Sequence, residues 1–418
     1  MRIATAHRLT TVTERTDATR VVNFSAGPAI LPASVLMELQ QALVDCDGQG
    51  LSILGLSHRA PLFDDIKASA SDRLRRLLAL PDSFDILFFP FGATLHFSAL
   101  ALNLLPDDGR AAYFRSGYWS EAATAEARRY GHIDVIPAPW ARPAPEPGLL
   151  ATDAAAGQAA PTAAGVAADQ ATDAADPSNR AAANSATTAA AADAKPSYAY
   201  AHYCDNETID GVEWPVLPHL PEVRVPLVAD MSSNLLTRPV DFTRFGLIYA
   251  SAQKNLGSAG LSVVLVRKDL LGRARSATPS LLDYGFIAAR HSNPNTAPVF
   301  AMLVLERVLA WCESEGGLPE MAVRADQRSR LLYDFFDQSS LYLSSVPAEL
   351  RSRLNLPFSL RCAELTAPCL AQAQQAGLVQ LAGHRSQGGL RASLYNAMPL
   401  SGVERLRDFL FEFERTHV

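Results

Sequence analysis

The sequence predicts an α/β protein, with a large domain built on a mostly parallel sheet and a smaller α+β domain at its C-terminal end. Two observations indicate this. Short apolar runs of strand length alternate with helical patterns up to about residue 300, and longer helices with a few short strands follow. With 418 residues and 48% hydrophobic content, the chain is also longer than one hydrophobic core usually supports.

Two helices are expected first. Residues 33–43 follow Pro32, a residue suited to a helix start, and residues 61–80 continue the helical pattern. Apolar residues share one face of the first helix and point inward in the second: Val35, Leu36, Leu39 and Leu43, then Phe63, Ile66, Leu74, Leu77 and Leu78.

Buried strands are expected next, alternating with crossover helices. The candidates are residues 86–89, 112–114, 133–136, 198–204, 225–229, 247–250 and 261–266. The first is followed by Gly92-Ala93-Thr94 and a helical pattern over residues 95–105. A strand, a turn of small residues and a helix together present backbone amides and a helix dipole to a phosphate.

The domain limits follow from composition. Residues 21–299 form the expected large domain, interrupted at 141–195 by an alanine-rich, low-complexity insert that cannot contribute to a core. Residues 1–20 are expected to be a disordered extension. The small domain, residues 300–418, is expected to contain helices at 301–312, 324–336 and 402–415 and strands at 355–360 and 390–395.

Composition excludes several function classes. The formal net charge of −6, with both signs interspersed, provides no basic surface for nucleic acid. No apolar run is long enough to cross a membrane, and residues 1–20 lack a signal-peptide core. The cysteines form no zinc-type spacing and suit the reducing cytoplasm, so we expect a soluble cytoplasmic protein without metal: Cys46, Cys204, Cys312, Cys362 and Cys369.

Lys254 and Asp230 are the strongest candidates for chemistry. Each follows an apolar run at the carboxyl end of an expected strand, the edge of an α/β sheet where ligands bind. Pyridoxal phosphate needs such a pair: an amine to hold its aldehyde as a Schiff base, and a carboxylate to keep its pyridine nitrogen protonated. Taken singly, a solvated lysine or a helix-capping aspartate would explain each residue.

Seven motifs in one order resemble the phosphoserine aminotransferase family. They are NFSAGPA at 23–29, SHR at 57–59, GYW at 117–119, NETIDG at 206–211, AQKN at 252–255, NT at 295–296 and RASLYNAM at 391–398. The resemblance covers nearly the whole chain except the N-terminal extension and the insert. It implies a class V pyridoxal-phosphate enzyme of fold type I, with a seven-stranded sheet, that acts as a homodimer with sites at the subunit boundary.

The activity implied is transfer of the amino group of L-glutamate to 3-phosphohydroxypyruvate, giving O-phospho-L-serine and 2-oxoglutarate. Use of 4-phosphohydroxythreonine in vitamin B6 synthesis stays an open alternative. By resemblance, Lys254 also moves the proton at the substrate Cα, and Trp119 stacks on the cofactor ring. The other implied cofactor contacts are Ala93, Thr94, Thr208, Asp230 and Gln253, with Asn295 and Thr296 from the partner subunit. Some members carry a basic residue where this chain has Thr94, so phosphate binding should depend more on backbone amides.

The substrates imply two anion sites. Arg391 matches the family residue that binds the carboxylate common to all substrates, for which a planar guanidinium is suited. The distal group is a phosphate or a carboxylate, and two His-Arg pairs are the expected donors: His58, Arg59, His384 and Arg385. Solvated loop positions for both pairs, and an exposed edge position for Arg391, are the alternatives.

Two rival functions remain at this point. The first is another class V enzyme, such as a cysteine desulfurase or an aminotransferase for small unphosphorylated acids. A desulfurase needs a mobile, exposed cysteine, and none of the five lies in a suitable Gly/Ser-rich loop. A cofactor-binding scaffold without catalysis would not require Lys254, Asp230 and Arg391 together.

Overall fold

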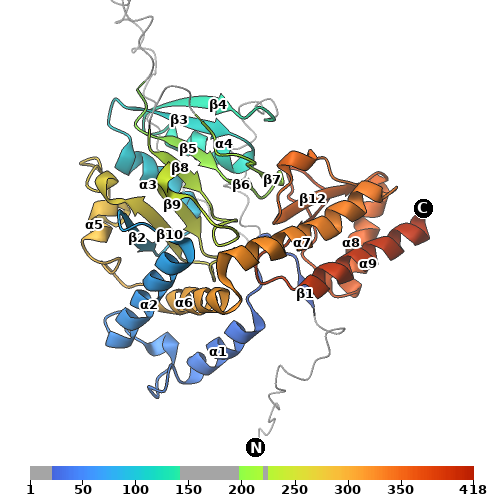
Figure 1. Ribbon diagram of the computed structural model, residues 1–418, viewed down its shortest axis with the longest axis horizontal. Helices are drawn as coiled ribbons and strands as arrows, with labels where there is room; N and C mark the ends of the chain where they lie inside the picture. The colour runs from blue at the N-terminus through green and yellow to red at the C-terminus, as the bar shows by residue number, and fades with distance from the viewer. Residues whose placement is uncertain (1–20, 142–196, 220–224) are drawn as a thin grey trace, which may run out of the picture. The chain divides into compact units, whose positions relative to one another are not determined.

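The computed structural model describes residues 21–141, 197–219 and 225–418 (Figure 1). The expected extension over residues 1–20 and the insert over residues 142–195 lie outside the described residues.

A seven-stranded sheet forms the centre of the fold, in the order β2-β10-β9-β8-β5-β3-β4. Its strands are β2 (Phe84–Phe89), β3 (Arg110–Arg115), β4 (His132–Pro137), β5 (Ala201–Cys204), β8 (Leu227–Asp230), β9 (Phe245–Ser251) and β10 (Ser262–Arg267). All neighbouring strands pair in parallel except β10, which is antiparallel to both β9 and β2. The predicted seven strands and mostly parallel sheet are confirmed.

Helices cover both faces of this sheet. One layer contains α1 (Ala33–Val44), α2 (Pro61–Leu78) and α6 (Val299–Ser314), and the other contains α3 (Ala93–Leu104), α4 (Tyr118–Ala127) and α5 (Tyr284–Ala288). Successive strand residues face opposite layers, as the pleat requires: Ile248 packs in the first core and Tyr249 in the second. Figure 1 shows α2 and α6 side by side, where they pack against each other.

The predicted apolar face of α1 is only partly buried. Val35 and Leu39 are buried together with Ala42, whereas Leu36 and Leu43 are 45% and 43% exposed. The four predicted residues do share one face of the helix, but α1 packs on α6 along a narrow stripe that buries only Val35 and Leu39 among them. In α2 the predicted inward residues are buried, apart from the half-buried Leu77.

The C-terminal part is built on a three-stranded antiparallel sheet, β11-β12-β14. Its elements are α7 (Gly317–Gln338), β11 (Tyr342–Leu343), β12 (Asn355–Leu360), α8 (Thr366–Gln375), β13 (Leu378–Val379), β14 (Leu390–Ser393) and α9 (Leu400–His417). A second core lies between this sheet and the helices. The strand β1 (Val22–Asn23) pairs with β13, so Val22 and Phe24 also belong to it.

Short elements complete the description. A hairpin of β6 (Asn206–Glu207) and β7 (Val212–Glu213) follows β5 and was not predicted, since two-residue strands leave no apolar pattern. The 3₁₀ helices are η3 (Ile53–Gly55), η4 (Phe242–Arg244), η5 (Lys268–Leu270), η6 (Ser280–Leu282), η7 (Ala348–Leu350) and η8 (Ala363–Leu365).

Candidate active site

Lys254 and Asp230 lie at the carboxyl ends of two neighbouring parallel strands, as predicted. Asp230 is the last residue of β8, and Lys254 follows the end of β9. The Asp230 carboxylate is 7% exposed and accepts a hydrogen bond from the Ser232 amide at 2.9 Å. Burial lowers the pKa of Lys254, and the charge of Asp230 is the strongest influence that raises it. The Asp230 carboxylate and the Lys254 amine are therefore close enough to interact electrostatically.

An aromatic ring and a hydroxyl join this pair. The Lys254 Nζ lies 5.7 Å from the centroid of the Trp119 ring. The indole Nε1 of Trp119 donates to the Thr208 Oγ1 at 2.8 Å, and Thr208 is buried directly after β6. Three residues assigned to the cofactor by resemblance are thus brought together.

The N-terminus of α3 offers unsatisfied amides beside this group. Gly92 precedes the helix, no side chain caps it, and its first turn holds no acid. A Cβ on Gly92 would lie 3.3 Å from the Ser251 Oγ, so the last residue of β9 approaches the helix start closely. The Ser251 hydroxyl donates to the Gln253 Oε1. The start of α3 is therefore a site suited to an anion, because it has hydrogen-bond donors and no acid. It is bordered by Ala93, the exposed Thr94 and Gln253.

Arg391 reaches the same site from the C-terminal sheet. The Arg391 Nη1 donates to the backbone oxygen of Thr208 at 3.1 Å. Burial lowers its pKa, an effect that Tyr395 opposes. Asn355 on β12 links the strand of Arg391 to the β6–β7 hairpin. Its Nδ2 donates to the Ser393 Oγ on β14 at 3.0 Å, and its Oδ1 accepts from Asn206 on β6 at 2.9 Å. Arg391 is half-buried and not a water-exposed edge residue.

His384 lies at the border of this site and Arg385 next to it is exposed. The His384 ring lies 5.4 Å from that of Tyr118, the neighbour of Trp119, and its Nδ1 is 2.7 Å from the Ser386 Oγ. In the same loop, Gln387 donates to the Asp210 Oδ1 at 3.0 Å.

The remaining predicted residues form a second group. The backbone oxygen of His58 accepts a hydrogen bond from Asn293 at 2.9 Å, so the loop of His58 and Arg59 contacts the loop that leads to Asn295 and Thr296. Arg59, Asn295 and Thr296 are exposed. Among the described residues, no hydrogen bond or ion pair connects these four to Lys254, Asp230 or Arg391. Within the described part of the chain, these four residues are thus not bonded to the Lys254 group.

Glu207 was overlooked by sequence reasoning. Its carboxylate is fully buried and accepts hydrogen bonds from the Trp119 amide at 2.8 Å, the Ser120 amide at 2.9 Å and the Ser116 hydroxyl at 3.1 Å. Burial, reinforced by Asp210, raises its pKa to about 7 against the opposing effect of these donors. The only signal was its place in the NETIDG motif at residues 206–211, which carries no apolar pattern.

The described residues also bear on metal binding, membrane insertion and thiol chemistry. No cluster of His, Cys, Asp and Glu there could hold a metal ion, and none of the helices there has the length and hydropathy of a membrane span. All five cysteines are unpaired thiols, four of them buried, and the exposed Cys362 donates to Glu364 at 3.0 Å. None belongs to the Lys254 group as a mobile nucleophile would, although buried Cys204 ends β5 next to Asp230.

Comparison with known proteins identifies the family. The model of the Aminotransferase class-V family matches residues 158–406. A phosphoserine aminotransferase of Acidithiobacillus ferrooxidans is 42% identical over 95% of this chain and 99% of its own length. The chain belongs to the class-V aminotransferase family.

Other relatives of this class-V aminotransferase carry the same name. A phosphoserine aminotransferase of Aromatoleum aromaticum is 42% identical over 94% of this chain and 98% of its own. The solved structure of the Bacillus circulans subsp. alkalophilus enzyme is 33% identical with a TM-score of 0.79, over 96% of this chain and 99% of its own. The pyridoxal-phosphate-bound phosphoserine aminotransferase of Trichomonas vaginalis is 32% identical with a TM-score of 0.77, over 94% and 100%.

Proposed function

We propose that this class-V aminotransferase is a phosphoserine aminotransferase. It would transfer the amino group between L-glutamate and 3-phosphohydroxypyruvate, giving O-phospho-L-serine and 2-oxoglutarate. The observation that supports this most is the arrangement of Lys254 and Asp230 at adjacent strand ends, with Trp119 beside the amine and Arg391 at the same site. The names of relatives 42% identical over nearly the full length support the substrate.

The residues present fit pyridoxal phosphate. Its phosphate would be bound by the uncapped amides of α3 at Ala93 and Thr94, with the side-chain NH₂ group of Gln253 as a neighbouring donor, since the Ser251 hydroxyl holds the Gln253 Oε1. A bulkier residue at position 92 would narrow the space between the start of α3 and Ser251. When bound, the cofactor supplies an aldehyde that combines with amines and a ring that accepts electrons as a Cα–H bond breaks.

The side chains around the ring have separate tasks. Lys254 would hold the cofactor covalently and then take and return the proton at the substrate Cα, a task for which its lowered pKa is suited. Asp230 would hold a proton on the ring nitrogen, and Trp119 would cover one face of the ring and exclude water. Thr208 would donate a hydrogen bond to the phenolic oxygen.

Substrate binding would use both groups of residues. Arg391 would bind the common carboxylate, and His384 with Arg385 the distal phosphate or carboxylate. His58, Arg59, Asn295 and Thr296 would complete the site of a second copy. We therefore propose a homodimer, supported by exposed apolar side chains that a partner could cover: Leu36, Met37, Leu43, Val44, Leu51, Leu54 and Leu95. The unpaired thiols support a cytoplasmic location.

The proposal is tested with purified protein supplied with pyridoxal phosphate. It should be yellow, lose this colour with borohydride, and change spectrum with phosphoserine or glutamate but much less with alanine. Lys254→Ala should abolish the covalent attachment and turnover. An equal response to alanine would contradict the phosphate specificity, and a colourless wild type would contradict the cofactor assignment. A panel of phosphorylated keto acids, including the one for 4-phosphohydroxythreonine, defines the substrate range.

A further inference from the structure

The N-terminus of α4 is bound by two carboxylates. The Tyr118 amide donates to the Asp210 Oδ2 at 2.9 Å, and the amides of Trp119 and Ser120 donate to the two oxygens of Glu207 at 2.8 and 2.9 Å. The first amides of a helix have no partner within the helix and carry partial positive charge. The two acids satisfy the first three of them at once.

Glu207 is in an unusual environment for a carboxylate. It is fully buried, and no arginine, lysine or histidine of the described residues forms an ion pair with it. A buried charge is costly unless hydrogen bonds compensate for it. Here the donors are the two α4 amides and the Ser116 hydroxyl. The position of the carboxylate and that of the helix start therefore depend on each other.

Gly117 permits this close approach. A Cβ at this position would lie 2.8 Å from the Asp210 Cγ and 2.9 Å from the Glu207 Cδ. Any other residue would displace one of the two acids or the start of the helix. Position 117 of the GYW motif therefore requires glycine, because a side chain there would occupy the space of the two carboxylates.

Trp119 is bound at both ends by consecutive residues of the hairpin region. Glu207 accepts from its backbone amide, and the Thr208 hydroxyl accepts from its indole Nε1 at 2.8 Å. The ring also faces the Lys254 amine at 5.7 Å. We propose that Glu207 is a positioning residue for the Trp119 indole: its carboxylate fixes the first turn of α4 so that the ring covers the cofactor site. This inference rests on the proposed function, in which Trp119 stacks on the cofactor.

The test compares Glu207→Gln with the wild-type holoenzyme. The amide keeps the size of the side chain and one acceptor oxygen, but turns an NH₂ group toward another donor. The variant should remain yellow and be trapped by borohydride at Lys254, because the lysine that forms the covalent bond is retained. Its visible circular dichroism should fall, because the ring is no longer held in one orientation. Turnover should drop about tenfold or more, the effect of leaving one buried hydrogen-bond donor without its acceptor, with a smaller change in KM for phosphoserine.

A second measurement does not depend on activity. Amide hydrogen exchange at Trp119 and Ser120 should accelerate about tenfold in Glu207→Gln, also without cofactor. Gly117→Ala, which keeps both carboxylates but displaces one of them or the start of the helix, should cause the same two changes and guards against a folding defect specific to Glu207→Gln. Glu306→Gln is the matched control, because Glu306 is a buried acid on α6 bonded to Ser69 and Arg73.

The outcomes are separable. Unchanged dichroism and unchanged exchange in Glu207→Gln, with a yellow wild type, would overturn the positioning role. An equal effect of Glu306→Gln would do the same, since any buried acid would then suffice. A colourless wild type would instead refute the proposed function.

Discussion

Burial and charge act in opposite directions on the Lys254 amine. Burial lowers its pKa, whereas Asp230, then Cys204 and Glu207, raise it, and the net effect is a lowered pKa. The neutral amine, which attacks aldehydes, is therefore present at lower pH than in an exposed lysine. Asp230 limits this lowering of the pKa, so that the amine becomes neutral at a higher pH than burial alone would give.

Replacing Asp230 by Asn should lower the pKa of Lys254 further, because the largest raising influence is removed. The neutral fraction at a given pH then increases. The measurement is the pH dependence of Lys254 acylation in the cofactor-free protein, followed by mass spectrometry. Transamination should nevertheless fall about a hundredfold or more, because a preorganised charge is lost. A Lys254 pKa that stays the same or rises would contradict the proximity of the two groups.

Arg391 is predicted to act on every substrate equally. Arg391→Lys loses the planar pair of donors, so kcat/KM should fall about ten- to a hundredfold for phosphoserine and for glutamate alike. Steady-state kinetics with both amino donors measures it. Arg361→Lys, an exposed position in the same part of the fold, is the control and should change neither. A loss confined to one substrate would assign Arg391 to the distal group instead.

At the scale of elements, the β6–β7 turn is fitted against β12. Gly211 has φ +70°, and a Cβ there would lie 2.5 Å from the Pro357 Cγ and 3.1 Å from the Asn355 oxygen. Gly211→Ala should therefore reduce the free energy of unfolding by about 2–4 kcal/mol, combining backbone strain and crowding. Urea denaturation measures it. Gly48→Ala is the matched control, because Gly48 has φ +76° with no atom within 4 Å. Equal losses in both variants would show that crowding against Pro357 is absent.

The large sheet was predictable because its strands are buried on both faces and leave uninterrupted apolar runs. The same property hides strand direction, so nothing in residues 261–266 distinguishes the antiparallel β10 from its parallel neighbours. The start of α4 was also not predictable, because the acceptors of its first three amides come from Glu207 and Asp210, far along the chain.

The candidate site shows the same division. Lys254 and Asp230 could be predicted because strand ends of a parallel sheet meet at one edge. The contacts of the His58 loop could not, because they depend on loop packing, such as the hydrogen bond from Asn293 to the backbone oxygen of His58. The roles of His58 and His384 as substrate ligands stay a prediction.

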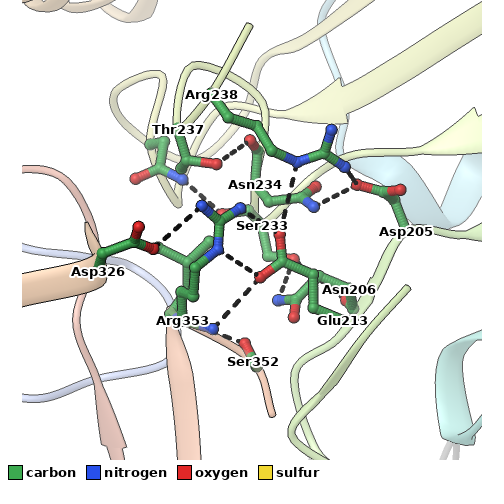
Figure 2. A network of polar contacts seen from close by, with 12 residues as sticks. Asp205, Asn206, Glu213, Ser233, Asn234, Thr237, Arg238, Asp326, Ser352 and Arg353 are labelled. Atoms are coloured by element: carbon green, nitrogen blue, oxygen red, sulfur yellow. Dashed lines mark hydrogen bonds and ion pairs between the residues drawn. The ribbon is translucent and has the colours of Figure 1, made fainter. Parts of the chain in front are cut away.

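At the scale of the whole molecule, a polar network connects the sheet with the C-terminal core (Figure 2). Buried Asp205 accepts from Arg238 at 2.7 Å; Glu213 accepts from Arg353 at 2.7 and 3.1 Å; and Arg353 lies 3.4 Å from Asp326 on α7. Burial would raise the pKa of Glu213, but Arg353 reverses this and lowers it. The hairpin that carries Glu207 and Thr208 is thereby linked to the strand after Arg353, which pairs with the strand of Arg391.

This network predicts a strong asymmetry between single and double substitutions. Arg353→Met should reduce the free energy of unfolding by about 3–5 kcal/mol, because Glu213 is left as a buried charge without its main partner. Adding Glu213→Leu should recover much of this loss, since no uncompensated charge then remains. Arg415→Ala removes an exposed pair with Glu412 and should leave the free energy of unfolding nearly unchanged. If the double variant is as unstable as the sum of the two single ones, the pair acts by packing and not by charge. If instead it regains stability but loses phosphoserine turnover, the ion pair serves to hold the hairpin and the Arg391 strand in register.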